Sequence, residues 1–185
     1  ILVLIGLRLS GKSTLGSIVA AHLKQDFVDL DHKVLQKLGA TSVTKTFHDI
    51  GEAAWREAER VELTSLLAAK KECVLSLGGG TPTALGVSDI LQTAKARNEI
   101  FIALLDPGEK ELVNRLTNNR GDRPLLNATK ASGDAAADAA SEVRALFESR
   151  MPLYRSLANV IVDTNESEPV CAKTLLAAFA AARAK

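Results

Sequence analysis

The sequence predicts an α/β fold, a five-stranded parallel sheet flanked by helices on both faces. Short apolar runs alternate along the chain with longer stretches of helical periodicity, which is typical of parallel sheets. The first run, Ile1 to Ile5, is apolar at every position, as expected of a central strand buried on both faces. The predicted strands are residues 1–5, 27–29, 73–77, 100–105 and 160–163.

Helices are predicted between these strands. Asp31 has the residue type of an N-cap, and Gly39 is a stop signal. Between them, Val34, Leu35 and Leu38 fall on one helix face. Residues 120–140, rich in Gly, Asp, Asn, Ala and Ser, are predicted to form a loop. The other helices are predicted up to about residue 24, within 43–48, over 51–70, within 85–96, and over 109–118, 141–157 and 169–185.

Chain length, net charge and the cysteines and histidines limit the classes of protein to which this sequence can belong. The 185 residues suit a single domain, residues 1–185, that buries a core without staples. A net charge of +1 argues against a partner such as nucleic acid or a membrane surface. Cys73 and Cys171 lie in apolar stretches and are predicted to be buried, reduced thiols. The three histidines show no ligand spacing, so we expect no zinc site.

The start of the chain bears on its location. Ile1 lies inside an apolar strand and is not Met, so we expect residues before it to have been removed. We expect a monomer in the cytoplasm, or in a plastid if a transit segment was among those residues.

The strongest motif is the segment Gly6-Leu-Arg-Leu-Ser-Gly-Lys-Ser13, which matches the P-loop pattern between a buried strand and a helix. Backbone N–H groups of such a loop and the N-terminus of its helix bind phosphate oxygens. Lys12 would place a charge on the β- and γ-phosphates of ATP, and the Ser13 hydroxyl would bind Mg²⁺. The nucleotide-binding residues predicted here are Gly6, Leu9, Ser10, Gly11, Lys12, Ser13 and Thr14.

Two carboxylates follow the second strand. Asp29 and Asp31 come at the carboxyl end of that strand, where parallel sheets bind ligands. Alternation in an extended segment would put both on the same side. One carboxylate, which we take to be Asp29, would hold Mg²⁺; the other, Asp31, would accept a proton from an attacking hydroxyl. The alternative is that Asp31 only caps the next helix.

An arginine and a run of glycines suggest a binding site for a carboxylate. Glu52 and Glu59 are spaced so that both can meet the guanidinium of Arg56, which would aim its fork at an anion. A solvated helical salt bridge is the alternative. Gly78, Gly79 and Gly80 follow the third strand, where close approach of a ligand to bare backbone would require glycine. A plain turn between strand and helix would also explain them.

Two more arginines complete the candidate set. Arg123 lies in the predicted loop before Pro124, which restricts it to extended conformations. On a mobile lid it would close over the γ-phosphate. Arg150 lies toward the end of the next predicted helix and offers one more cation. For Arg123 the alternative is an ordinary solvated charge, and for Arg150 it is a charge at the C-terminus of a helix.

Taken together, these motifs resemble those of shikimate kinases over nearly the whole chain. They occur in the family's order and at similar spacing, and the order is more specific than any single motif. The matching segments are Gly6 to Ser13; Asp29-Leu-Asp31; Phe47, Gly51-Glu52, Trp55-Arg56 and Glu59; Leu77-Gly-Gly-Gly80; Arg123-Pro-Leu-Leu126; and Arg150-Met-Pro-Leu-Tyr154.

The resemblance implies a nucleoside-monophosphate-kinase-like fold, with substrate-binding helices at about 31–60 and a lid at about 120–140. It implies transfer of the γ-phosphate of ATP, with Mg²⁺, to the 3-hydroxyl of shikimate, on the route to chorismate and aromatic amino acids. By this match Lys12, Asp31 and Arg123 are catalytic, and Arg115 joins Arg123 at the nucleotide. Substrate contacts are assigned to Asp31, Arg56, Gly78, Gly79, Gly80 and Arg150.

The chain departs from the family pattern at three places. Leu9 stands where the family often has Gly, and Trp55 replaces the usual Phe. The stretch from Asn127 to Ala140 is longer than a typical lid segment.

Two other functions fit part of the pattern. Another hydroxyl kinase of this fold, such as a gluconate kinase, would share the P-loop and the lid. A regulatory module that binds nucleotide without turnover would keep the fold, but the presence of Lys12, Ser13, Asp29, Asp31 and Arg123 argues against it.

Overall fold

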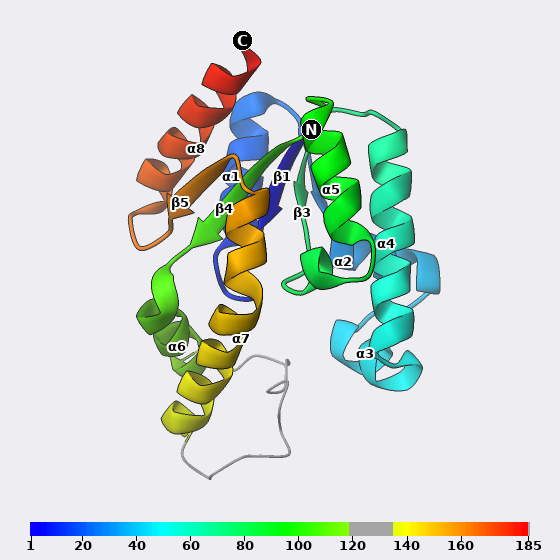
Figure 1. Cartoon of the computed structure of the whole chain (residues 1–185), viewed down its shortest axis with the longest axis vertical. Helices are drawn as coiled ribbons and strands as arrows, with labels where there is room; N and C mark the ends of the chain where they lie inside the picture. The colour runs from blue at the N-terminus through cyan, green and yellow to red at the C-terminus, as the bar shows by residue number, and fades with distance from the viewer. Residues whose placement is uncertain (119–134, 185) are drawn as a thin grey trace.

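The computed structural model describes residues 1–118 and 135–184, and it has the α/β architecture expected from the sequence (Figure 1). The strands are β1 Leu2–Ile5, β2 Asp26–Asp29, β3 Cys73–Ser76, β4 Phe101–Asp106 and β5 Val160–Asp163. The helices are α1 Lys12–Leu23, α2 Leu30–Leu38, α3 Val43–Ile50, α4 Glu52–Ala68, α5 Val87–Ala96, α6 Gly108–Asn118, α7 Ala135–Leu157 and α8 Glu168–Arg183, with a 3-10 helix, η1 Thr81–Thr83.

The five strands form one parallel sheet in the order β2-β3-β1-β4-β5. The central strand β1 is apolar throughout because its side chains enter two cores. Val3 and Ile5 pack on the face covered by α5 and α7. Leu2 and Leu4 pack on the face covered by α1 and α8. The prediction of a doubly covered parallel sheet is therefore confirmed.

A smaller cluster lies where α2, α3 and α4 meet. Figure 1 shows these three helices together on the right of the molecule. The buried members of the cluster are Val34, Leu35 and Trp55. Leu38 was predicted to share their buried face. That prediction is wrong, because Leu38 is 45% exposed. The cluster is too small to cover the last turn of α2, which ends at this residue.

Two local predictions need correction. Residues 135–140 were expected in a loop, but α7 begins at Ala135, because a run rich in Ala favours helix. Asp31 is not the N-cap of α2. Asp29 occupies that position and accepts a bond from the His32 N–H at 3.3 Å, since β2 leads directly into the helix.

Two further observations concern the described residues. Cys73 and Cys171 are free and buried, as predicted. In residues 1–118 and 135–184, no helix has the length and apolar character needed to span a bilayer.

Candidate active site

The P-loop lies between β1 and α1, at the carboxyl edge of the sheet. Gly11, immediately before α1, has φ 92°, a conformation that favours glycine. Lys12 is the first residue of α1, and its Nζ donates to the carbonyl oxygens of Gly6 at 2.9 Å and Leu7 at 2.8 Å. These bonds hold the ammonium group against the loop that would receive phosphate.

Leu9 adopts a left-handed conformation with φ 64°. For a non-glycine residue this costs about 1–2 kcal/mol. The Leu9 side chain packs against the core, and its carbonyl accepts a bond from Arg115 Nη1 at 3.1 Å. Packing and this bond therefore offset the strain of the loop.

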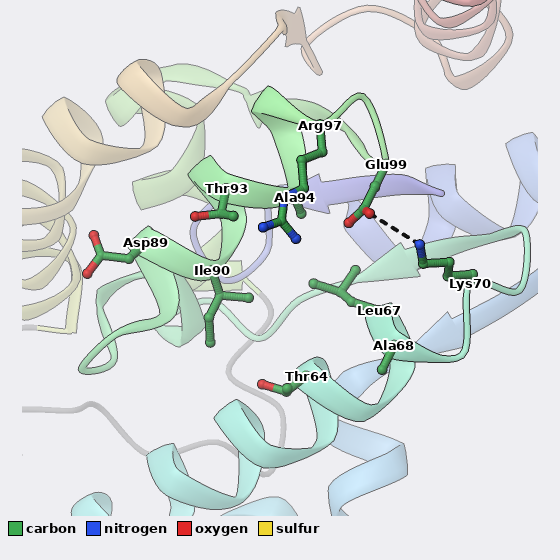
Figure 2. Close-up of a pocket in the computed structure, with 10 residues that line it drawn as sticks. All are labelled: Thr64, Leu67, Ala68, Lys70, Asp89, Ile90, Thr93, Ala94, Arg97 and Glu99. Carbon is green, nitrogen blue, oxygen red and sulfur yellow. Dashed lines mark ion pairs between the residues drawn. The ribbon is translucent and has the colours of Figure 1, made fainter.

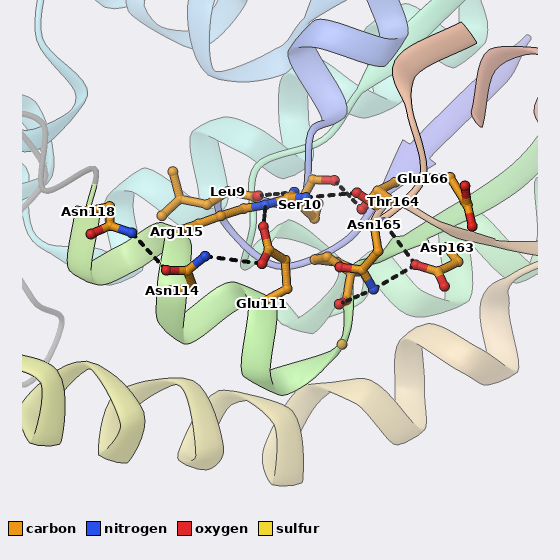
Figure 3. A network of polar contacts seen from close by, with 12 residues as sticks. Leu9, Ser10, Glu111, Asn114, Arg115, Asn118, Asp163, Thr164, Asn165 and Glu166 are labelled. Carbon is orange, nitrogen blue, oxygen red and sulfur yellow. Dashed lines mark hydrogen bonds and ion pairs between the residues drawn. The ribbon is translucent and has the colours of Figure 1, made fainter. Parts of the chain in front are cut away.

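Arg115 connects the P-loop to the segment after β5 (Figure 3). Its Nη2 donates to Thr164 O at 2.7 Å, and its Nε donates to Glu111 at 2.8 Å. Thr164 Oγ1 donates in turn to Ser10 O at 3.1 Å. Arg115 thus lies beside the P-loop, and its contact with the nucleotide stays a prediction. Thr164, which no sequence pattern singled out, is part of the same network.

The two oxygen groups predicted to hold Mg²⁺ lie together. Ser13 Oγ is 3.3 Å from Asp29 Oδ2, and both side chains are accessible from solvent. Hydroxyl and carboxylate oxygens are the donors that Mg²⁺ prefers. The chemistry of this pair therefore fits the ion.

Asp31 lies in the first turn of α2 and faces the glycine triplet. A Cβ on Gly78 would lie 2.6 Å from Asp31 Oδ1 and 2.5 Å from Glu59 Oε1. Glu59 is buried and accepts a bond from Thr81 Oγ1 at 2.5 Å. Burial raises the pKa of Glu59 above its ordinary value, although Arg56 and Thr81 favour its charged form.

Arg56 is held by the two glutamates predicted to meet it. Its Nη1 donates to Glu59 at 2.7 Å, and its Nε and Nη2 donate to Glu52, each at 3.3 Å. The guanidinium lies over the Phe47 ring, 5.7 Å from its centroid, and against Gly80, where a Cβ would collide with it. The guanidinium of Arg56 is therefore held in one orientation and is partly buried.

Arg150 and Tyr154, both on α7, contact the same backbone group. Arg150 Nη1 and the Tyr154 hydroxyl donate to Gly79 O at 3.0 and 2.8 Å. Burial raises the pKa of Tyr154 to about 12, so the hydroxyl remains a donor at neutral pH. Through the triplet, Arg150 comes close to Arg56, which lies far away in the sequence.

The glycine triplet is explained by protein contacts. Asp31 and Glu59 crowd Gly78, Arg56 crowds Gly80, and the backbone N of Arg8 in the P-loop lies 2.9 Å from where a Cβ of Gly79 would be. Protein groups therefore account for the need for glycine here, and the predicted approach of a ligand to this backbone stays a prediction. Arg123, predicted to act from a lid, lies outside the described residues.

A second hollow lies between α4 and α5 (Figure 2). Leu67, Ile90 and Ala94 contribute apolar surface, and an ion pair of Lys70 and Glu99 at 3.4 Å lies at one end. None of the predicted site residues lines it. The P-loop and its surroundings remain the candidate active site.

Fold and site together define a P-loop kinase. The family model for shikimate kinase matches residues 8–180. The chain belongs to the shikimate kinase family and is therefore an ATP-dependent kinase.

Relatives and solved structures agree with this family. A shikimate kinase of Mycobacterium marinum is 36% identical over 167 residues, covering 90% of this chain and 82% of that protein. A structure of the Acinetobacter baumannii shikimate kinase in complex with shikimate superposes with a TM-score of 0.82, at 28% identity, covering 100% of this chain and 94% of that one. A gluconokinase from Sinorhizobium meliloti has a TM-score of 0.55 at 14% identity, covering 97% of this chain and 90% of that one, and shares the fold alone.

Proposed function

We propose that this chain transfers the γ-phosphate of ATP to the 3-hydroxyl of shikimate. The observation that carries the proposal is the meeting of Arg56 and Arg150 at the glycine triplet, beside the P-loop. Shikimate has one carboxylate and three hydroxyls. Two arginines suit the carboxylate, and Asp31 with the backbone of Gly78, Gly79 and Gly80 suits the hydroxyls.

ATP would bind on the P-loop. The N–H groups of the loop, from Gly6 to Thr14, would surround the phosphates at the N-terminus of α1. Lys12 would exchange its bonds to Gly6 O and Leu7 O for bonds to phosphate oxygens. Arg115 would lie near the adenine side, and Arg123 would neutralise charge on the γ-phosphate.

The oxygens of Ser13 and Asp29 would hold Mg²⁺, which supplies charge neutralisation at the phosphates when bound. Asp29 has a second duty as the N-cap of α2, so its side chain is already oriented by the helix.

Asp31 would orient the attacking hydroxyl and accept its proton. It lies at the Gly78 end of the triplet, close to Glu59. Arg56, on the other side of Glu59, would hold the substrate carboxylate, so that the ring is fixed at two ends.

The test is a coupled ADP-release assay with shikimate, gluconate and nucleoside monophosphates as acceptors. The proposal expects turnover with shikimate and values of kcat/KM for the others lower by orders of magnitude. Preference for gluconate would instead support the other kinase class, and nucleotide binding without any turnover would support a regulatory module. A monomer, expected from the sequence, would be checked by light scattering on the same sample.

A further inference from the structure

The P-loop carries a second cation, Arg8, and an acid on α7 pairs with it. Arg8 Nη2 lies 2.5 Å from Glu142 Oε1, and the exposed fractions of the two side chains are 14% and 3%. Taking two charges out of water is costly, and the cost is offset only where both partners are held in good geometry. This pair therefore fixes the first turn of the P-loop against α7.

The same helix also holds the other half of the site. Arg150 and Tyr154 follow Glu142 by about two and three turns of α7, and both bond to Gly79 O. The Gly79 backbone in turn packs on the Arg8 backbone. Arg8, Gly79 and one continuous helix thus form a closed circuit of contacts.

Apolar packing also holds the P-loop against α7. Leu7 and Leu9, the neighbours of Arg8, join the same core as Val143, the neighbour of Glu142. A movement of the P-loop on binding phosphate would therefore act on α7 at Glu142 rather than be absorbed by loose surroundings.

We propose that Glu142 is a positioning residue which, through Arg8, couples the nucleotide half of the site to the shikimate half. The inference rests on the proposed function. When phosphate fixes the position of the P-loop, the pair of Arg8 and Glu142 fixes the position of α7. That helix then places Arg150 where it can bind the substrate carboxylate. The two ligands should then strengthen each other's binding.

The experiment is calorimetric titration of shikimate into the full chain, with and without saturating MgADP, which allows no phosphate transfer. Glu142→Gln keeps the shape of the side chain and removes its charge. The double variant Arg8→Met/Glu142→Leu replaces the pair by apolar groups of similar size, so it keeps the fold if the single variant unfolds. The matched control is Glu109→Gln, which breaks the exposed pair of Glu109 with Arg144, also on α7.

The native chain and the control should bind shikimate about fivefold or more tightly with MgADP than without. In the two variants this ratio should fall to about one, with shikimate affinity in the absence of nucleotide little changed. A native ratio retained in the variants, with or without a lower melting temperature, means that the pair is only structural and overturns the inference. A native ratio of one overturns it too. Failure of the native chain to bind shikimate at all would overturn the proposed function as well.

Discussion

At the scale of single residues, the site works by holding charges in place before ligands arrive. Lys12 is bonded to two carbonyls of its own loop, and Arg56 lies between two glutamates. Leu9 shows that the P-loop tolerates a strained residue when its side chain is packed and its carbonyl is bonded. Substitution of these charged side chains should therefore remove charge from the site without disturbing the packing of the core.

Lys12→Ala should abolish turnover and leave the fold intact. The ammonium group supplies charge to the phosphates, and its side chain is not part of the core clusters. The coupled assay and far-ultraviolet circular dichroism are the measurements, with Lys33→Ala, on α2, as a control that should stay active. Near-native activity of Lys12→Ala would contradict the P-loop assignment.

Asp31→Asn should lower kcat by about a hundredfold or more while nucleotide affinity stays native, because Asn is a poor proton acceptor. The substitution leaves the N-cap of α2 untouched, since Asp29 is the cap. Steady-state kinetics and ADP titration provide the two numbers. If the variant keeps most of its kcat, Asp31 does not accept the proton.

At the scale of elements, α4 and α7 carry the side chains that we propose recognise the substrate. α4 presents Arg56 and Glu59 one turn apart, and α7 presents Arg150 and Tyr154 one turn apart. The glycine triplet after β3 fits between the two helices only because it has no side chains. Under the proposed function, a shift of either helix should therefore change the affinity for shikimate.

Arg56→Ala and Arg150→Ala should each raise the KM for shikimate about tenfold or more, with little change in ATP binding. A hydrogen bond to a charged group contributes roughly 1.5–3 kcal/mol. Lys should not fully replace Arg56, because it lacks the planar fork.

A shikimate analogue with a neutral amide tests the reason for that effect. The native chain should use it poorly, and the two variants should lose little further. Variants that distinguish acid from amide as sharply as the native chain would show that these arginines do not bind the carboxylate.

Glu59→Gln should change the dependence of stability on pH. The folded state raises the pKa of Glu59 above its ordinary value of 4.5, so the folded chain binds this proton more tightly than the unfolded chain. The resulting stabilisation is complete below that value and is lost as pH rises through the raised pKa. Relative to Glu59→Gln, the native chain should therefore lose free energy of unfolding as pH rises above 4.5 through the raised pKa.

Urea denaturation at several pH values measures this difference. Glu57→Gln is the matched control on the same helix, since Arg60 lowers the pKa of Glu57 and the dependence should have the opposite sign. If the difference in free energy of unfolding between Glu59→Gln and the native chain is the same at low and high pH, Glu59 does not have a raised pKa in the folded chain.

At the scale of the whole molecule, β1 is the centre of stability. It pairs with β3 and β4, and each of its residues from Leu2 to Ile5 is fully buried. The site lies where β1 ends, so the P-loop begins on the best-anchored strand. The edge strands β2 and β5 are paired on one side only within the described sheet.

Amide hydrogen exchange should accordingly be slowest in β1 and faster in β2 and β5. Exchange of central strands requires opening of the whole sheet, whereas edge strands open locally. Mass spectrometry of peptides covering the three strands is sufficient to rank them. Protection of β5 equal to that of β1 would contradict this order.

Local sequence patterns predicted some features of this chain and misplaced others. Strand positions were predictable because apolar runs and glycines are local signals. The N-cap was misassigned because Asp29 and Asp31 have the same chemistry, and only the end of β2 distinguishes them. Glu142 gave no signal, since an acid on a helix is usually solvated and its partner lies in another part of the chain.

The sequence by itself determined the doubly covered parallel sheet, the P-loop from Gly6 to Ser13 and the support of Arg56 by two glutamates. Each depends on residues close together in the chain, so periodicity and spacing suffice. Only the tertiary structure decided that Arg150 meets Arg56 at the glycine triplet and that Arg8 pairs with Glu142. These meetings depend on the strand order β2-β3-β1-β4-β5 and on the packing of α7 across it, which no local pattern encodes.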